Sequence, residues 1–241
     1  MTAVVGAQVR LVGPQIEVLS PEPNGKGPAL FTLTSLPDAF LQWQLTSRRV
    51  LFSSHLATGD RVRRFQAHLP VVVTYSSHGV FPVHTANKGV GLLPRLEYLQ
   101  PYIQAFKGLL AQVDKGTWQE TLAQRIAMVD SLYSAPHRLD RRCLGSLEIF
   151  LGQTYRNILA DPRVTLHYTG EGPNYPSFQV NAIAQVVYPG DPHFEFLYWA
   201  RQLFEYDAFH IQQPAYPAGY LFWVCEVYDK SPSGGGGRRI A

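Results

Sequence analysis

The densest alternation of hydrophobic and polar positions lies between residues 177 and 229. Apolar side chains recur at every second position of 178–188, which is the period of a half-buried strand. Pro189-Gly190 ends this strand, and Asp191-Pro192 has the order of a helix N-cap followed by proline at the first helical position. A second strand, 220–228, is apolar on both faces, which predicts a covered central strand. The connection is long enough for the two strands to lie parallel.

The predicted helix 192–209 carries apolar residues nearly all the way round its surface. A helix that lies on one sheet needs only one apolar stripe, so the additional aromatic side chains must be covered by something else. A second layer of the same chain would cover them, and so would a partner subunit. In the second alternative the interface residues are Phe194, Phe196, Tyr198, Trp199 and Tyr206.

Residues 1–93 show short, partly alternating segments separated by turn residues. This pattern is typical of an antiparallel β region, such as a small sandwich or an open barrel. Strands are predicted at 8–12, 16–19, 30–36, 40–45, 50–56, 61–75 and 80–85.

The period changes to that of helices in residues 94–160, where about three helices are predicted. Leu96, Leu99, Ile103, Phe106 and Leu110 are spaced 3, 4, 3 and 4 residues apart, which is a helical seam. A capping box, Thr117 with Glu120, predicts the start of the next helix, and a third is expected over 139–159.

The C-terminal range 161–230 is predicted to be a β-β-α-β unit that packs with these helices, followed by a Gly-rich tail at 231–241. The predicted fold class is therefore α+β. It has an N-terminal antiparallel β region, a central helical segment and a C-terminal sheet unit.

Composition adds one hint about the surface. The chain has 241 residues, of which 46% are hydrophobic and only 16% are charged, below the usual ~25%. Such a surface favours burial in an assembly, although a neutral polar surface rich in Gln, Ser and Thr would give the same numbers. The net charge of +3 does not by itself demand nucleic acid.

Targeting and redox signals indicate a reducing compartment. The N-terminus lacks the basic and apolar regions of a signal peptide, and no apolar run is long enough for a transmembrane helix. Cys143 and Cys225 both lie within apolar patterns, which favours two small core residues over a disulfide. We expect a cytoplasmic protein, or a virion protein if the chain is viral, without a membrane partner.

Known catalytic and cofactor motifs are missing from the sequence. The eight histidines form no H-x-x-x-H or H-x-H pair, so we predict no metal site. There is no G-x-S-x-G and no Walker lysine motif, and Gly89-Val90-Gly91 lacks the third glycine of a dinucleotide loop. The sequence therefore predicts no catalytic residue of a known type and no cofactor.

Arginine clusters are the strongest polar signal. One cluster spans two neighbouring predicted strands around Gly59-Asp60, and the other crowds the start of the predicted third helix, where the helix dipole disfavours cations. Asp140 would offset that cost, and so would a phosphate backbone or an acidic protein. Aromatic residues among the arginines either stack on bases or face the core. The nucleic-acid-binding alternative uses Arg48, Arg49, Arg61, Arg63, Arg64, Arg138, Arg141 and Arg142.

A family likeness exists only in the order of elements. Residues 146–228 are predicted as helix, strand, strand, helix, strand, which resembles the small α+β domain of bacteriophage tail-terminator and connector proteins. The likeness covers about a third of the chain and rests on no residue motif. Half of a ferredoxin-like fold has a related order, and that fold also underlies RNA-binding subunits of CRISPR complexes.

Three hypotheses for function follow from these observations. The first is a non-catalytic structural subunit of a larger complex, such as a phage tail or connector component, with homo- or hetero-oligomeric protein partners. The second is a nucleic-acid-binding subunit of a ribonucleoprotein complex of the CRISPR type. The third is an enzyme whose site has no recognised motif. Salt dependence separates the first two, because phosphate contacts weaken steeply with salt and hydrophobic contacts do not.

Overall fold

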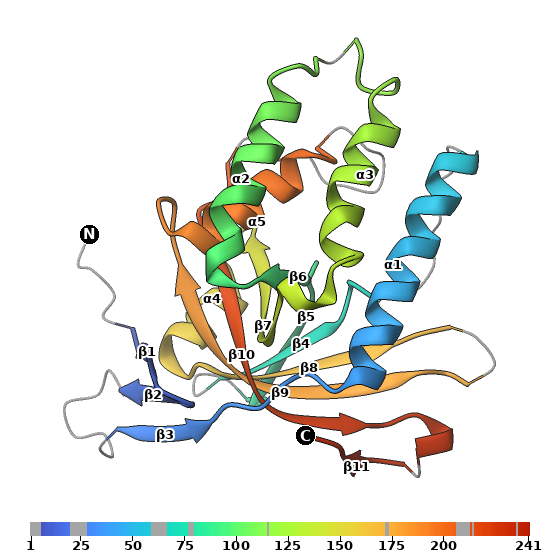
Figure 1. Ribbon diagram of the computed structural model, residues 1–241. Coiled ribbons are helices and arrows are strands. Elements are labelled where there is room, and N and C mark those ends of the chain that lie inside the picture. Colours follow the sequence, from blue (N-terminus) through green and yellow to red (C-terminus); the bar gives the residue numbers. More distant parts are fainter. Residues whose placement is uncertain are drawn as a thin grey trace.

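The structure of the chain is a computed structural model (Figure 1). It describes residues 6–19, 28–58, 67–76, 80–114, 116–171, 174–205, 213, 215–234 and 236–241.

Helices and strands alternate irregularly along this described part. The helices are α1 (Asp38–Thr58), α2 (Leu96–Leu110), α3 (Leu122–Tyr133), α4 (Gln153–Ala160) and α5 (Pro192–Gln202), with 3-10 turns at Pro136–Arg138 and Pro232–Gly234. The strands are β1 (Gln8–Val12), β2 (Gln15–Leu19), β3 (Ala29–Thr32), β4 (Val71–Tyr75), β5 (Val83–Asn87), β6 (Gly91–Pro94), β7 (Leu139–Glu148), β8 (Arg163–Thr169), β9 (Ser177–Val187), β10 (Ala218–Asp229) and β11 (Arg238–Arg239).

The large sheet closes on itself through the segment 83–94. Its strand order is β5-β4-β8-β9-β10-β7-β6, with every neighbouring pair antiparallel. β5 and β6 are consecutive in the chain, and the pairing with β4 continues between them. The Lys88 N–H donates to Pro70 O at 3.2 Å and the Val90 N–H to His68 O at 2.8 Å. Because β6 then pairs with β7, the strands form a closed barrel in which β5–β6 is one bent strand.

The registers decide which side chains fill the barrel. Successive residues point to opposite faces, so directly paired residues share a face. Val72 pairs with Leu166 and Leu166 with Val180, while Phe222 pairs with Leu144. All five are at most 1% exposed, so this face is the interior.

Helix α5 covers the outer face of the barrel and α2 packs against it (Figure 1). Asp191 caps α5, since its Oδ1 accepts hydrogen bonds from the His193 N–H at 2.8 Å and the Phe194 N–H at 3.4 Å. The helix approaches the strands where they carry glycine. A Cβ on Gly145 would lie 2.9 Å from Leu197 Cδ2. The N-cap and first-position proline predicted for this helix are confirmed.

Helix α1 closes one end of the barrel with aromatic side chains. Phe40, which is fully buried, makes edge-on contacts with the rings of Tyr168 at 5.1 Å and Phe178 at 5.3 Å. Trp43 adds further contacts, with its ring centroid 5.5 Å from that of Phe178. We call Phe40, Trp43, Tyr168 and Phe178 the aromatic end.

Three predicted elements differ in secondary structure from the structure. The predicted strands 40–45 and 50–56 are parts of helix α1, whose side chains must reach across the aromatic end. The predicted helix 139–159 is strand β7 followed by the short helix α4. Nine of the ten residues of β7 are buried or half-buried, because the barrel covers one face and α5 the other, and such a run has no period of two.

Two finer expectations are also wrong. The strands at 177–187 and 218–229 lie antiparallel, because the connection through α5 returns the chain along the neighbouring strand instead of crossing over. The expected capping box does not form. Thr117 bonds to Asp114 in a turn, and α3 begins at Leu122 with Thr121 at the N-cap position.

The α+β class predicted from the sequence is confirmed, with antiparallel sheets of three and eight strands in the described part. Strands of the large sheet come from all three predicted ranges, 1–93, 94–160 and 161–230. Among the described helices, none has both the length and the apolarity to cross a bilayer. The cytoplasmic or virion location stays a prediction.

Candidate functional site

A buried ion pair lies where the two strands that close the barrel separate. Lys88 and Glu148 lie three residues beyond the Gly91–Gly145 pair that ends the β6–β7 ladder, in the same register. The Lys88 Nζ donates to Glu148 Oε2 at 2.8 Å, and their side chains are only 11% and 5% exposed. At this position the side chains, rather than backbone hydrogen bonds, connect the strands.

Glu148 is surrounded by donors. Its Oε1 accepts the N–H groups of Ile149 at 2.9 Å and Phe150 at 3.2 Å. Its Oε2 accepts the Tyr220 O–H at 2.5 Å in addition to Lys88. Each oxygen of this carboxylate therefore accepts two hydrogen bonds.

Lys88 has more donors than this carboxylate uses. An ammonium group carries three N–H donors, and the bond to Glu148 is its one hydrogen bond within the described part of the chain. Its nitrogen also lies 5.5 Å from the centre of the Tyr220 ring, a cation–π distance. The remaining donors can therefore bind a ligand or water.

Three tyrosines line the same end of the barrel. The hydroxyl groups of Tyr155 on α4 and Tyr188 after β9 lie 3.0 Å apart. Burial and then this hydrogen bond raise the pKa of Tyr188 to about 12. Burial, followed by the hydrogen bond to Glu148, raises the pKa of Tyr220 far above its usual value. We call Lys88, Glu148, Tyr155, Tyr188 and Tyr220 the polar end.

Helix α4 positions the polar end. Its Asn157 Nδ2 donates to the Oγ1 of Thr74, a fully buried residue of β4, at 3.0 Å, and Gln153 holds the Asn157 side chain at 2.6 Å. These bonds fix the helix against the barrel interior. Two aromatic residues of this region are exposed, Phe150 to 67% and Tyr188 to 47%.

The predicted interface residues of α5 lie partly inside the protein. Phe194 and Phe196 are each 3% exposed, and Phe196 packs on Phe106 of α2 with ring centres 5.7 Å apart. Tyr198 and Trp199 are half-buried, with Lys107 lying over the Trp199 ring. Tyr206 lies outside the described residues. The second layer that covers the aromatic helix is therefore α2 of the same chain.

The described arginines of the predicted clusters make separate contacts within the chain. Arg48 is buried in α1, where it donates to Val90 O at 2.8 Å. Arg49 forms a bidentate pair with Asp130 of α3. Arg61, Arg63 and Arg64 lie outside the described residues.

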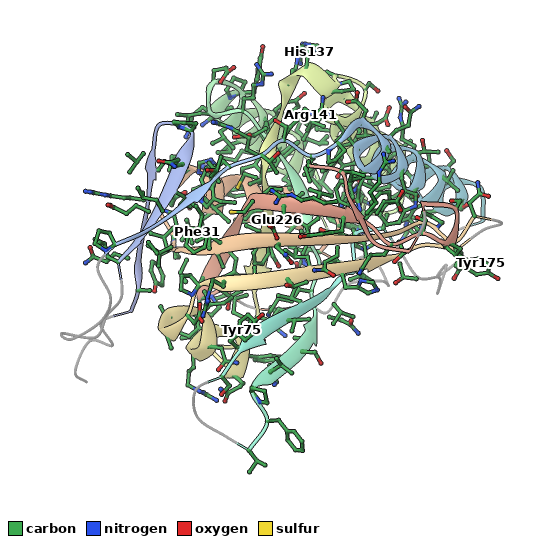
Figure 2. The ribbon with its side chains drawn as sticks, turned by 90° about the horizontal axis from the view of Figure 1, so that it is seen from below. Phe31, Tyr75, His137, Arg141, Tyr175 and Glu226 are labelled. Atoms are coloured by element: carbon green, nitrogen blue, oxygen red, sulfur yellow. The ribbon has the colours of Figure 1, made fainter. Side chains whose placement is uncertain are left out.

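The second cluster lies on β7 and the turn before it, not at a helix start. The Arg141 guanidinium donates to Leu36 O and pairs with Asp38, and Figure 2 shows Arg141 on the opposite side of the view from Tyr75. Arg142 pairs with Asp140 at 3.6 Å, and Arg138 lies over the Tyr98 ring. Nucleic acid as a partner stays a prediction.

The described part of the chain holds no group of three or more His, Cys, Asp or Glu residues that could bind a metal ion. Both cysteines have raised thiol pKa values because of burial, to about 11 for Cys225 and well above the usual range for Cys143. Their protonated thiols are poor nucleophiles.

No family model and no curated protein matches the sequence. Several solved structures show a distant likeness. HupZ from Group A Streptococcus is 12% identical, with 71% of this chain and 89% of that chain covered and a TM-score of 0.39. A putative pyridoxamine 5'-phosphate oxidase from Lactobacillus delbrueckii is 14% identical, with 80% and 93% covered and a TM-score of 0.38. General Stress Protein 26 from Bacillus anthracis is 10% identical, with 73% and 93% covered and a TM-score of 0.36.

The prediction of a phage tail or connector-type assembly subunit is wrong. The similar solved structures are named as HupZ, an oxidase and a stress protein. The prediction depended on an exposed aromatic helix, and Phe194 and Phe196 of that helix belong to the core of the chain. At identities of 10–14% these likenesses place the chain in no family.

Proposed function

We propose that the chain binds a small planar ligand carrying a phosphate or carboxylate group at the polar end of the barrel. The observation that carries this proposal is the Lys88 ammonium, which is almost buried and uses one of its three donors within the described residues. An anionic group would accept the other two donors. Charge-assisted hydrogen bonds of this kind are among the strongest in proteins.

Aromatic surface next to Lys88 favours a ligand with a ring. Phe150 follows Glu148 by two residues, and its backbone N–H bonds to that carboxylate. Phe150 and Tyr188 are exposed and would offer stacking surface to such a ring. Binding sites commonly combine such apolar walls with a few polar groups that orient the ligand.

Glu148 would have a positioning role. It is held by two backbone N–H groups, so it fixes the Lys88 nitrogen at 2.8 Å. Tyr220 keeps its proton because its pKa is raised, so it stays a donor and adds no second negative charge. An anionic ligand would therefore be held by the remaining donors of the Lys88 ammonium.

Calorimetric titration tests the proposal with pairs of ligands that differ only in the anion. The pairs are pyridoxamine 5'-phosphate with pyridoxamine, and flavin mononucleotide with riboflavin. In each pair we expect the form without the phosphate to bind at least about tenfold more weakly, roughly 1.4 kcal/mol. Inorganic phosphate alone measures the anion without the ring.

A double substitution, Lys88→Met with Glu148→Gln, removes the ammonium without leaving a buried charge unpaired. It is expected to abolish the preference for the phosphorylated ligands. Lys107→Met on α2 removes one ammonium away from the site and should bind as the natural chain does. Failure of every ligand to bind, or equal binding by the double variant, would show that the ion pair only connects two strands.

A further inference from the structure

The outer edge of β5 is open to another strand. Hydrogen bonds to β4 come from even-numbered residues of the bent strand, as Lys88 with Pro70 and Val90 with His68 show. In an antiparallel ladder the alternate residues direct both backbone groups to the other side. Val83, Thr85 and Asn87 therefore point their N–H and C=O groups away from β4.

These outward groups have no hydrogen-bond partner in the described part of the chain. β7 pairs with the bent strand only from Gly91 onward, so it does not reach β5. The three residues are exposed, and the strand, VHTAN, carries no proline, lysine or acidic residue. Proteins usually protect free edges with such residues, because an unprotected edge pairs with other strands.

We propose that β5 pairs antiparallel with β5 of a second copy of this chain, about a two-fold axis at Thr85. This register places Thr85 opposite the partner's Thr85 and Val83 opposite the partner's Asn87. Each copy would donate three N–H groups and accept at three C=O groups. The full overlap of Val83–Asn87 uses every outward backbone group of the strand.

Exposed apolar residues make the edge complementary to itself. Phe81 and Val80, which are 78% and 93% exposed, lie just before β5. The same register places the partner's Phe81 opposite Gly89. The space above Gly89 is open, because a Cβ added to this glycine would have no atom within 4 Å. Leu69, which is 45% exposed, is the neighbour of Gly89 on the β4 side. The two-fold axis thus brings together apolar groups that lie apart on one copy, which favours a second copy over an unrelated strand.

Light scattering on the eluting peak measures the mass. The natural chain is expected at twice the monomer mass of 27.0 kDa. Thr85→Pro removes the central outward N–H without removing a bond to β4, so it should yield a folded monomer. Thr85→Ala keeps that N–H and should remain a dimer. A monomer at all concentrations, or a dimer that Thr85→Pro does not split, would overturn the proposal.

Disulfide formation tests the register. Paired Cα atoms at a hydrogen-bonded antiparallel position lie about 5.5 Å apart, within the range for a disulfide. Thr85→Cys should therefore form a covalent dimer under mild oxidation. Val83→Cys alone should not form a cross-link, because the two copies of this residue would lie about four residues, roughly 13 Å, apart along the strands. Mixing Val83→Cys with Asn87→Cys should restore the cross-link. Cross-linking only at Val83 would contradict the register.

Discussion

The two ends of the barrel are closed in opposite ways. Helix α1 closes the aromatic end with Phe40 and Trp43 against Tyr168 and Phe178, all of them ring contacts. Helix α4 lies at the polar end, where Lys88, Glu148 and Tyr220 form a buried ionic cluster. Ring packing stabilises the fold but does not select a ligand. A buried charge destabilises the fold, and it is retained where it connects strands or binds a ligand.

The first prediction removes the centre of the aromatic end. Phe40→Ala deletes a fully buried ring that contacts the rings of Trp43, Tyr168 and Phe178, so the free energy of unfolding should fall by about 4 kcal/mol. Urea denaturation followed by circular dichroism measures this. Ligand binding by the fraction that stays folded should be unchanged, because the ring lies at the other end of the strands. A loss of less than about 1 kcal/mol would show that the end can collapse around the cavity.

The second prediction breaks the ion pair at the polar end. Glu148→Gln leaves the Lys88 ammonium nearly buried without its counter-charge, so stability should fall by about 3 kcal/mol. The Lys88→Met, Glu148→Gln double variant should recover most of that loss, since no charge is left unpaired. A double variant that is as unstable as the sum of the single changes would mean that the two residues do not interact.

The third prediction is the smallest and concerns pH. The phenol of Tyr188 has its pKa raised to about 12 in the folded protein, from about 10 in the unfolded chain. The folded state therefore holds this proton more tightly, and the contribution to stability is present below pH 10 and is lost as pH rises toward 12. Tyr188→Phe should make the free energy of unfolding fall less steeply with pH over that range, by a slope equivalent to at most about one proton released on unfolding. The exposed Tyr175→Phe is the control.

Sequence patterns predicted the parts of the fold in which each element has one clear period. The strand expected at 178–188 is β9, the seam from Leu96 to Leu110 is α2, and Asp191 caps α5. The α1 and β7 segments were predicted wrongly, because α1 contacts both the aromatic end and helix α3, and β7 is covered on both faces. Neither has the pattern of an element that lies on one surface.

The polar end could not be predicted for a related reason. Lys88 and Glu148 are 60 residues apart in sequence, and Glu148 lies inside the segment that resembles a helix. Only closure of the barrel through 83–94 brings them together. A signal was present in the form of a single acidic residue within the apolar run 147–151, where a charge needs a partner. The arginines, by contrast, were conspicuous in the sequence, yet Arg48 serves the packing of α1.

A crystal structure with pyridoxamine 5'-phosphate tests the central claim most directly. The account predicts the phosphate within about 3 Å of the Lys88 nitrogen, with the ring against Phe150 or Tyr188. The Lys88–Glu148 bond of 2.8 Å should persist in the complex. A ligand located elsewhere, or a polar end that stays free of ligand at a concentration that saturates binding in solution, would contradict the account.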